Sequence, residues 1–136
     1  MILHAHLMKI FNIIFAVLFL GFAALQYNDP DPYVWIPIYA GMVVVCLLAI
    51  QKRSYKLLTI ILAIIYVGYA AILSPALVTW WQSEDRGLLF DDLAKMQFPY
   101  IEETREFLGL MICLGVLAIN HFVLAKKLNT TRSITP

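Results

Sequence analysis

Two short acidic stretches carry the side chains of this chain that are best suited to chemistry. The first is NDPDP at residues 28–32, in which two aspartates alternate with two prolines. The second is EETRE at residues 102–106, in which three glutamates surround one arginine. Carboxylates gathered in this way hold a hard cation through oxygen ligands, or are neutralised by an arginine among them. Either outcome requires a fold that brings the two stretches to one place.

The first stretch also has a purely structural interpretation. A residue that precedes proline is pushed out of helical geometry, so both aspartates should lie outside a helix. Asn28 can then close one helix, and Asp31 followed by Pro32 makes an N-cap with proline at the first helical position. A five-residue hairpin between two antiparallel helices results. Asp29 is the residue that has no capping role in this interpretation.

The second stretch fits the first turn of a helix equally well. If EETRE is helical, Glu102 and Glu106 share one face, and Glu102 can pair with Arg105. Glutamates in a first turn also suit the positive end of the helix dipole. This interpretation needs no ligand, and it stays open beside the binding hypothesis.

Histidines, cysteines and catalytic motifs give little support to enzyme chemistry. His4, His6 and His121 could lie near one membrane face, but their spacing is a weak signal, so haem is disfavoured. Cys46 and Cys113 are expected at different depths, and the sequence has no C-x-x-C, no G-x-S-x-G and no H-E-x-x-H. We therefore assign no catalytic residue and no cofactor, and leave open a divalent cation at the acidic stretches.

Composition indicates which elements must position these residues. Of 136 residues, 62% are hydrophobic and 14% are charged, and the mean hydropathy is +0.80, outside the range of soluble globular chains. A membrane-spanning helix needs roughly 20 apolar residues. The sequence therefore predicts an all-α protein, a four-helix transmembrane bundle in a single domain, 1–136. The predicted spans are 10–27, 33–51, 57–82 and 107–125, followed by a short disordered tail at 128–136.

Two local features modify these spans. The first apolar run is longer than a typical signal core and lacks a clean A-x-A site, so we expect a retained helix rather than a cleaved signal. Pro75 lies inside the third run and removes one backbone donor, which predicts a kink or a tilt there.

Charged residues predict the orientation in the membrane. Seven of the ten basic residues fall before the first span, between the second and third, or after the fourth, whereas all nine acidic residues fall on the opposite side. Under the positive-inside rule both termini are cytoplasmic, and the extracytoplasmic side, with three basic residues against nine acidic ones, carries about −6. The total charge of +1 gives no basic field for nucleic acid. No charged residue lies within a span, which argues against a proton-coupled carrier.

Polar and aromatic residues near the ends of the spans complete the predicted architecture. Asn12 and Asn120 should lie at similar depth and hydrogen-bond between helices, a contact worth roughly 1 kcal/mol. The long third connection could form a short amphipathic helix on the outer interface. Its apolar positions are Leu89, Leu93 and Met96, beside Asp91, Asp92 and Lys95. An aromatic belt is expected at the outer boundary, made of Tyr27, Tyr33, Trp35, Trp80, Trp81 and Tyr100.

With QYNDPDPYVWIPIY at residues 26–39 and EETREFLGLMIC at residues 102–113, the chain resembles the transmembrane protein 220 family. The resemblance covers nearly the whole chain, including the four spans and the long third connection. It implies a small four-helix integral membrane protein without an established activity, so no catalytic residue is carried over. The family's motif positions in this chain are Asn28, Asp29, Pro30, Asp31, Pro32, Trp35, Glu102, Glu103, Arg105, Glu106 and Gly109.

These observations predict a multi-pass membrane protein that acts as a non-enzymatic interaction or accessory protein. Its expected surroundings are the lipid bilayer and a membrane or extracytoplasmic protein partner, with no nucleic acid. The predicted binding rim consists of Asn28, Asp29, Asp31, Trp35, Glu102, Glu103, Arg105 and Glu106, with Asp29, Asp31 and Glu102 as candidate cation ligands. Two alternatives remain: a small oligomeric transporter or channel subunit, and a membrane enzyme that acts on lipid.

Overall fold

The structure is a computed structural model that describes residues 2–91 and 97–132. Nearly all of these residues are helical, and no strand occurs among them. The elements are α1 (Ile2–Leu25), the 3-10 helix η1 (Gln26–Asn28), α2 (Pro32–Ile50), α3 (Lys56–Gln82), the 3-10 helix η2 (Arg86–Phe90) and α5 (Pro99–Arg132). Within the described ranges, four segments are long and apolar enough to cross a membrane. The predicted all-α, four-span class is therefore confirmed.

The helices extend beyond the apolar runs at three places, the start of α1 and both ends of α5. α1 begins at Ile2, eight residues before the predicted span, and α5 begins at Pro99, eight residues before residue 107. Residues 128–132, predicted as part of a disordered tail, belong to α5, and residues 133–136 lie outside the described residues. Hydropathy marks the depth of the hydrocarbon, whereas a helix can continue into polar sequence on either side of it.

The chain divides into two compact units. Unit 1 consists of Met1–Leu62 with Gly115–Pro136, and unit 2 consists of Ala63–Leu114. Helices α3 and α5 contribute residues to both units. The single domain that the sequence predicts stays a prediction.

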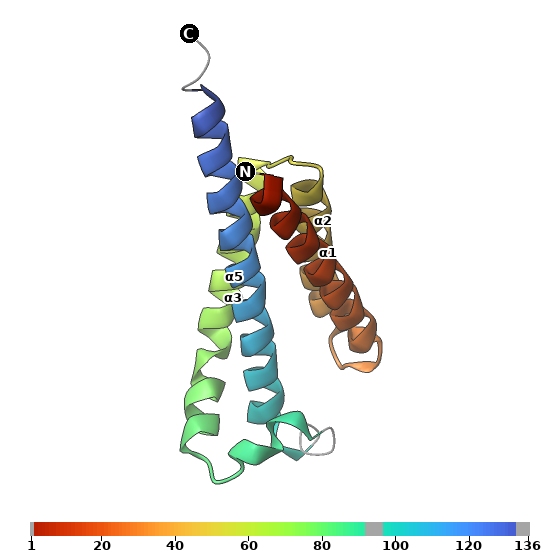
Figure 1. Cartoon of the computed structure of the whole chain (residues 1–136). Coiled ribbons are helices and arrows are strands. Elements are labelled where there is room, and N and C mark those ends of the chain that lie inside the picture. Colours follow the sequence, from red (N-terminus) through yellow and green to blue (C-terminus); the bar gives the residue numbers. More distant parts are fainter. Residues whose placement is uncertain (1, 92–96, 133–136) are drawn as a thin grey trace. The chain divides into compact units, whose positions relative to one another are not determined.

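An antiparallel hairpin of α1 and α2 makes up much of unit 1 (Figure 1). Its interface is aromatic: the rings of Phe19 and Tyr39 stack with centroids 6.3 Å apart, and Phe22 meets Tyr39 edge-on at 5.4 Å. Trp35, one turn before Tyr39 in α2, lies 6.0 Å from the same ring and has no exposed surface. Aromatic pairs at these separations are favourable beyond the area that they bury. The turn between the two helices therefore rests on a packed aromatic core.

Two buried amides join α1 to α5 within unit 1. Asn12 Nδ2 donates to Asn120 Oδ1 at 2.9 Å, and Asn120 Nδ2 donates to Asn12 Oδ1 at 2.7 Å. Asn12 Nδ2 also donates to the carbonyl oxygen of Met8 at 2.9 Å. The two side chains are 1% and 3% exposed. The hydrogen bond predicted between these helices is confirmed.

The C-terminus of α2 closes in a Schellman motif. Lys52 N–H donates to the carbonyl of Ala49 at 3.0 Å, and Arg53 N–H donates to the carbonyl of Leu48 at 2.9 Å. Lys52 has φ = 59°, the left-handed conformation that this motif requires. Glycine usually fills the position, because an L-residue there places its Cβ close to the backbone. Lys52 therefore holds a strained backbone at the start of the connection to α3.

In unit 2, α3 presents one face to the interior and passes through a proline. Tyr66, Ala70 and Leu73 recur at helical spacing and are buried. Pro75 lacks the N–H that would bond the carbonyl of Ala71, and Ser74 Oγ donates to that carbonyl instead, at 2.8 Å. The hydroxyl thus satisfies the acceptor that the proline leaves open, and the helix continues to Gln82.

The 3-10 helix η2, a described part of the connection between α3 and α5, packs onto the ends of both helices within unit 2. Leu89 of η2 and Ile101 of α5 form a small buried cluster, packed against Trp80, Leu88, Phe98 and Tyr100. Trp80 Nε1 donates to the carbonyl of Arg86 at 3.3 Å, which holds the start of η2 against α3. Of the residues predicted to form an amphipathic helix on the outer interface, Leu89 is instead buried against α5 in the 3-10 helix η2, and Asp91 is exposed just after it. The other four, Asp92, Leu93, Lys95 and Met96, lie outside the described residues.

Candidate functional site

The NDPDP turn in unit 1 has the backbone that its prolines dictate. The 3-10 helix η1 ends at Asn28, and Asp29 N–H donates to the carbonyl of Gln26 at 3.1 Å. Asp29 is then extended, with φ = −80° and ψ = 160°, as expected of a residue before proline. Helix α2 starts at Pro32, with Asp31 at the N-cap position. The predicted hairpin turn and its proline at the first helical position are confirmed.

The Asp31 side chain does not perform the capping role that its position offers. The backbone carbonyl of Asp31 accepts from Val34 N–H at 3.1 Å, but the carboxylate makes no cap hydrogen bond. An N-cap aspartate usually accepts from a backbone N–H two or three residues on. The fold therefore uses the backbone of Asp31 and leaves its carboxylate available. Asn28 is exposed, and Asp29 and Asp31 are each half-buried.

Trp35 has a different role from the one expected. Trp35 was predicted both in the aromatic belt at the outer boundary and in the binding rim, but its side chain is fully buried against Tyr39. Tyr27, Tyr33 and Trp81, in contrast, are 79%, 87% and 66% exposed, as belt residues should be. The four-residue spacing of Trp35 and Tyr39 is the sequence signal for a shared buried face.

The EETRE segment in unit 2 forms part of the first turns of α5. Thr104 is fully buried, and its hydroxyl donates to the carbonyl of Tyr100 at 2.7 Å. Glu103 is exposed, and Glu102, Arg105 and Glu106 are half-buried. The segment is therefore helical, as the spacing argument required, with one face packed and the charged side chains beside it.

Tyr100 and Asp85 add a polar contact that the sequence analysis did not identify. The Tyr100 hydroxyl donates to Asp85 Oδ2 at 3.2 Å, which ties the start of α5 to the residue before η2. Fifteen residues separate the two, and part of the intervening chain lies outside the described residues. No local pattern in the sequence relates them.

The two halves of the predicted rim belong to different units. Asn28, Asp29, Asp31 and Trp35 lie in unit 1, whereas Glu102, Glu103, Arg105 and Glu106 lie in unit 2. Within the described part of each unit, no three His, Cys, Asp or Glu side chains gather as metal ligands would. A cation held by Asp29, Asp31 and Glu102 would draw on both units, and it stays a prediction together with the rim.

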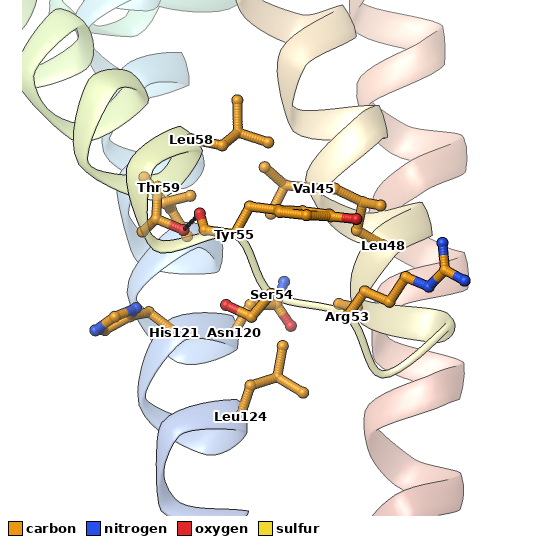
Figure 2. Close-up of a pocket in the computed structure, with 12 residues that line it drawn as sticks. Val45, Leu48, Arg53, Ser54, Tyr55, Leu58, Thr59, Asn120, His121 and Leu124 are labelled. Atoms are coloured by element: carbon orange, nitrogen blue, oxygen red, sulfur yellow. Dashed lines mark hydrogen bonds between the residues drawn. The ribbon is translucent and has the colours of Figure 1, made fainter. Parts of the chain in front are cut away.

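Unit 1 also contains a hollow at the end of α2 opposite the NDPDP turn, which sequence reasoning missed. Its walls come from the last turns of α2, the connection to α3, the first turn of α3 and the second half of α5 (Figure 2). His121, weighed above as a haem ligand, lies in this lining. The remaining lining residues are Val45, Leu48, Ala49, Arg53, Ser54, Tyr55, Leu58, Thr59, Leu117, Asn120 and Leu124. The sequence signal for this hollow is the basic connection between α2 and α3, which contributes Arg53, together with the polar residues Asn120 and His121 of α5.

Comparison with known proteins supports the family resemblance carried by the two motifs. Neither the curated proteins nor the solved structures contain a match to this chain. A family model, described as transmembrane family 220, matches residues 18–122, which include the NDPDP turn, the EETRE segment and most of the four spans. This is well over half of the chain and agrees with the resemblance carried by the two motifs. The chain is a multi-pass membrane protein and belongs to transmembrane family 220.

Proposed function

We propose that the protein is a non-enzymatic interaction or accessory protein that binds a cationic group at an extracytoplasmic acidic rim. In this proposal both termini are cytoplasmic, and the NDPDP turn and the EETRE segment face the same extracytoplasmic compartment. The rim carries carboxylates from both segments, with Asp31 and Glu103 as the residues that meet the ligand.

The observation that carries the proposal is the unused carboxylate of Asp31. Its position is that of an N-cap, yet its side chain makes no cap hydrogen bond. Trp35, one turn below, is fully buried in the aromatic core, so the turn sits on a rigid support. A rigid backbone with an available carboxylate lowers the entropic cost of binding a ligand at the turn.

The net negative charge of the proposed extracytoplasmic side favours a cationic ligand. All nine acidic residues of the chain, against three basic ones, fall in the segments that we assign to the extracytoplasmic side. A divalent cation, the ammonium group of a lipid headgroup, or a basic segment of a partner protein all have the required charge. Glu103 is exposed, so a ligand can reach it without a change in the fold.

Thermal unfolding of the detergent-purified protein tests the rim. Calcium, magnesium, phosphoethanolamine and a tetralysine peptide would each be titrated, because a ligand that binds only the folded state raises the midpoint with concentration. At a hundredfold excess over Kd the expected gain is about 2.7 kcal/mol. The shift should disappear in Asp31→Asn and Glu103→Gln, whose carboxylates the described structure does not use for folding.

Glu84→Gln is the matched control. Glu84 also carries an exposed carboxylate on the proposed extracytoplasmic side, but it is not a residue of the rim. If all three variants lose the shift equally, the ligand responds to general surface charge and the rim is wrong. If none of the four probes shifts the midpoint, the cationic ligand is excluded and NDPDP is only a turn.

Labelling of single cysteines tests the orientation separately. In a background with Cys46 and Cys113 replaced by alanine, Asn28→Cys and Lys126→Cys each add one exposed thiol. A membrane-impermeant maleimide applied to intact cells should label the first and not the second. The opposite result would place the rim in the cytoplasm.

A further inference from the structure

We propose that the hollow at the basic end of unit 1 binds the phosphate of an anionic phospholipid. The hollow lies where the apolar part of α2 ends at Ile50 and the basic connection begins at Lys52. It is therefore expected at the level of the lipid headgroups, on the membrane face opposite the proposed rim. This site and the rim share no residue, so the proposal does not rest on the proposed function.

The lining of the hollow is divided between an apolar wall and a polar mouth. Val45 and Leu117 are buried within it, and Leu58 and Leu124 are half-buried, which gives a surface suited to the upper part of an acyl chain. Arg53, Ser54 and Tyr55 line the hollow and are exposed, so we take these three consecutive residues as its mouth. Figure 2 shows Ser54 among the lining residues, with Arg53 extending outward on one side and His121 on the other.

The side-chain donors at the mouth are not used by the fold. Among the described residues, the side chains of Arg53, Ser54 and Tyr55 make no hydrogen bond or ion pair, and His121 Nδ1, which is buried, has no hydrogen-bond partner. Thr59, in contrast, donates to the carbonyl of Tyr55 at 3.3 Å, and Asn120 is paired with Asn12. A guanidinium and two hydroxyls that share one mouth make a donor set suited to phosphate oxygens.

The local electrostatics favour an anion. Lys52, Arg53 and Lys56 place three positive charges in five residues, and the sequence has no Asp or Glu between residues 31 and 84. α3 begins at Lys56 with no acidic residue in its first turn, so the positive end of its dipole is not compensated there. Lys52 does not line the hollow, but it precedes the lining residue Arg53 and adds a positive charge to the same connection, at a backbone position where glycine would cost less.

The size of the hollow decides how a ligand could sit. The hollow is partly open and has a volume of about 20 Å³, enough for about one water molecule and too small to surround a phosphate group. The phosphate must therefore lie at the open mouth, beside Arg53, Ser54 and Tyr55. A lipid meets this condition because its acyl chains remain along the helices while its headgroup stays at the interface.

The test measures the binding of dioctanoyl phosphatidylglycerol to the detergent-purified protein. Native mass spectrometry reports the bound lipid, and thermal unfolding reports the change in stability. Phosphatidylglycerol should bind and raise the unfolding midpoint, whereas dioctanoyl phosphatidylcholine and inorganic phosphate at the same concentration should not. A matching shift with inorganic phosphate would show a free-anion site, and a matching shift with phosphatidylcholine would show general lipid adsorption; either overturns the proposal.

Variants separate this site from the general attraction of a basic surface. Arg53→Gln should weaken binding tenfold or more, and Ser54→Ala and Tyr55→Phe, which keep the charge, should each weaken it about threefold, roughly the value of one neutral hydrogen bond. Lys9→Gln removes one charge from the same end outside the hollow and should weaken binding about fivefold at most. If Arg53→Gln and Lys9→Gln are equivalent and the hydroxyl variants have no effect, the proposal is wrong.

Discussion

The reciprocal amide pair between α1 and α5 allows a quantitative prediction. Replacing Asn12 or Asn120 by leucine keeps the approximate side-chain size, removes the two hydrogen bonds of 2.9 and 2.7 Å, and leaves the opposite amide buried. An unsatisfied buried polar group costs about 1–3 kcal/mol. Interhelical hydrogen bonds in membrane proteins contribute about 0.6 kcal/mol on average and about 1.7 kcal/mol at most. Each single variant should therefore lose about 1–3 kcal/mol in free energy of unfolding.

The double variant distinguishes pairing from two independent losses. With both asparagines replaced by leucine, no amide is left unsatisfied, so the loss should be smaller than the sum of the two single losses by about 1–3 kcal/mol. The free energy would be measured by SDS titration in mixed micelles, for the wild type, both single variants and the double variant. Asn12→Leu combined with a change at the exposed Asn28 should be additive, because that side chain lies outside the pair. A coupling energy below about 0.5 kcal/mol would refute the reasoning.

Three further predictions concern single side chains. Lys52→Gly should stabilise the protein by about 1 kcal/mol in the same titration, because φ = 59° costs an L-residue about that much, and Lys52→Ala, which keeps the Cβ, should not. Trp35→Ala should lose about 3 kcal/mol through the cavity that it leaves, whereas Tyr33→Ala, at a side chain 87% exposed, should lose less than about 0.5 kcal/mol. Tyr100→Phe removes the hydrogen bond of 3.2 Å to Asp85 and should lower the free energy of unfolding by about 1 kcal/mol. Amide hydrogen exchange in Arg86–Phe90 should become faster, and unchanged exchange would contradict the role of that contact.

Hydropathy predicted the middle of the fold well and the ends of the helices poorly. The second and third spans agree with α2 (Pro32–Ile50) and α3 (Lys56–Gln82) to within one residue, because there the apolar run and the helix have nearly the same boundaries. α1 and α5 are different, since their helices continue through polar sequence such as EETRE. Side-chain polarity reports depth in the membrane, and backbone hydrogen bonding does not need to stop where the hydrocarbon stops.

In the candidate site, too, features set by neighbouring residues in the sequence were predicted, whereas features set by packing between helices were not. Local rules gave the turn at Asp29, the start of α2 at Pro32 and the helical EETRE segment, because proline and helix spacing act over a few residues. They could not show that Trp35 faces inward or that the Asp31 carboxylate is left unused. Those two facts depend on which side of α2 meets α1, and this is decided by packing between helices.

The two proposed sites differ in the sign of the charge that they bind, and this makes them separable in one protein. The rim presents the carboxylates of Asp31 and Glu103, whereas the hollow presents Arg53 with two hydroxyls. Phosphatidylethanolamine carries both an ammonium group and a phosphate, so two separate molecules of this lipid, one in each leaflet, offer a group of the matching sign to the rim and to the hollow. Loss of its effect in Asp31→Asn but not in Arg53→Gln would assign it to the rim, and the reverse would assign it to the hollow. Because the half-buried Asp31 carboxylate makes no cap hydrogen bond and Glu103 and Arg53 are exposed, either assignment requires no rearrangement of the helices.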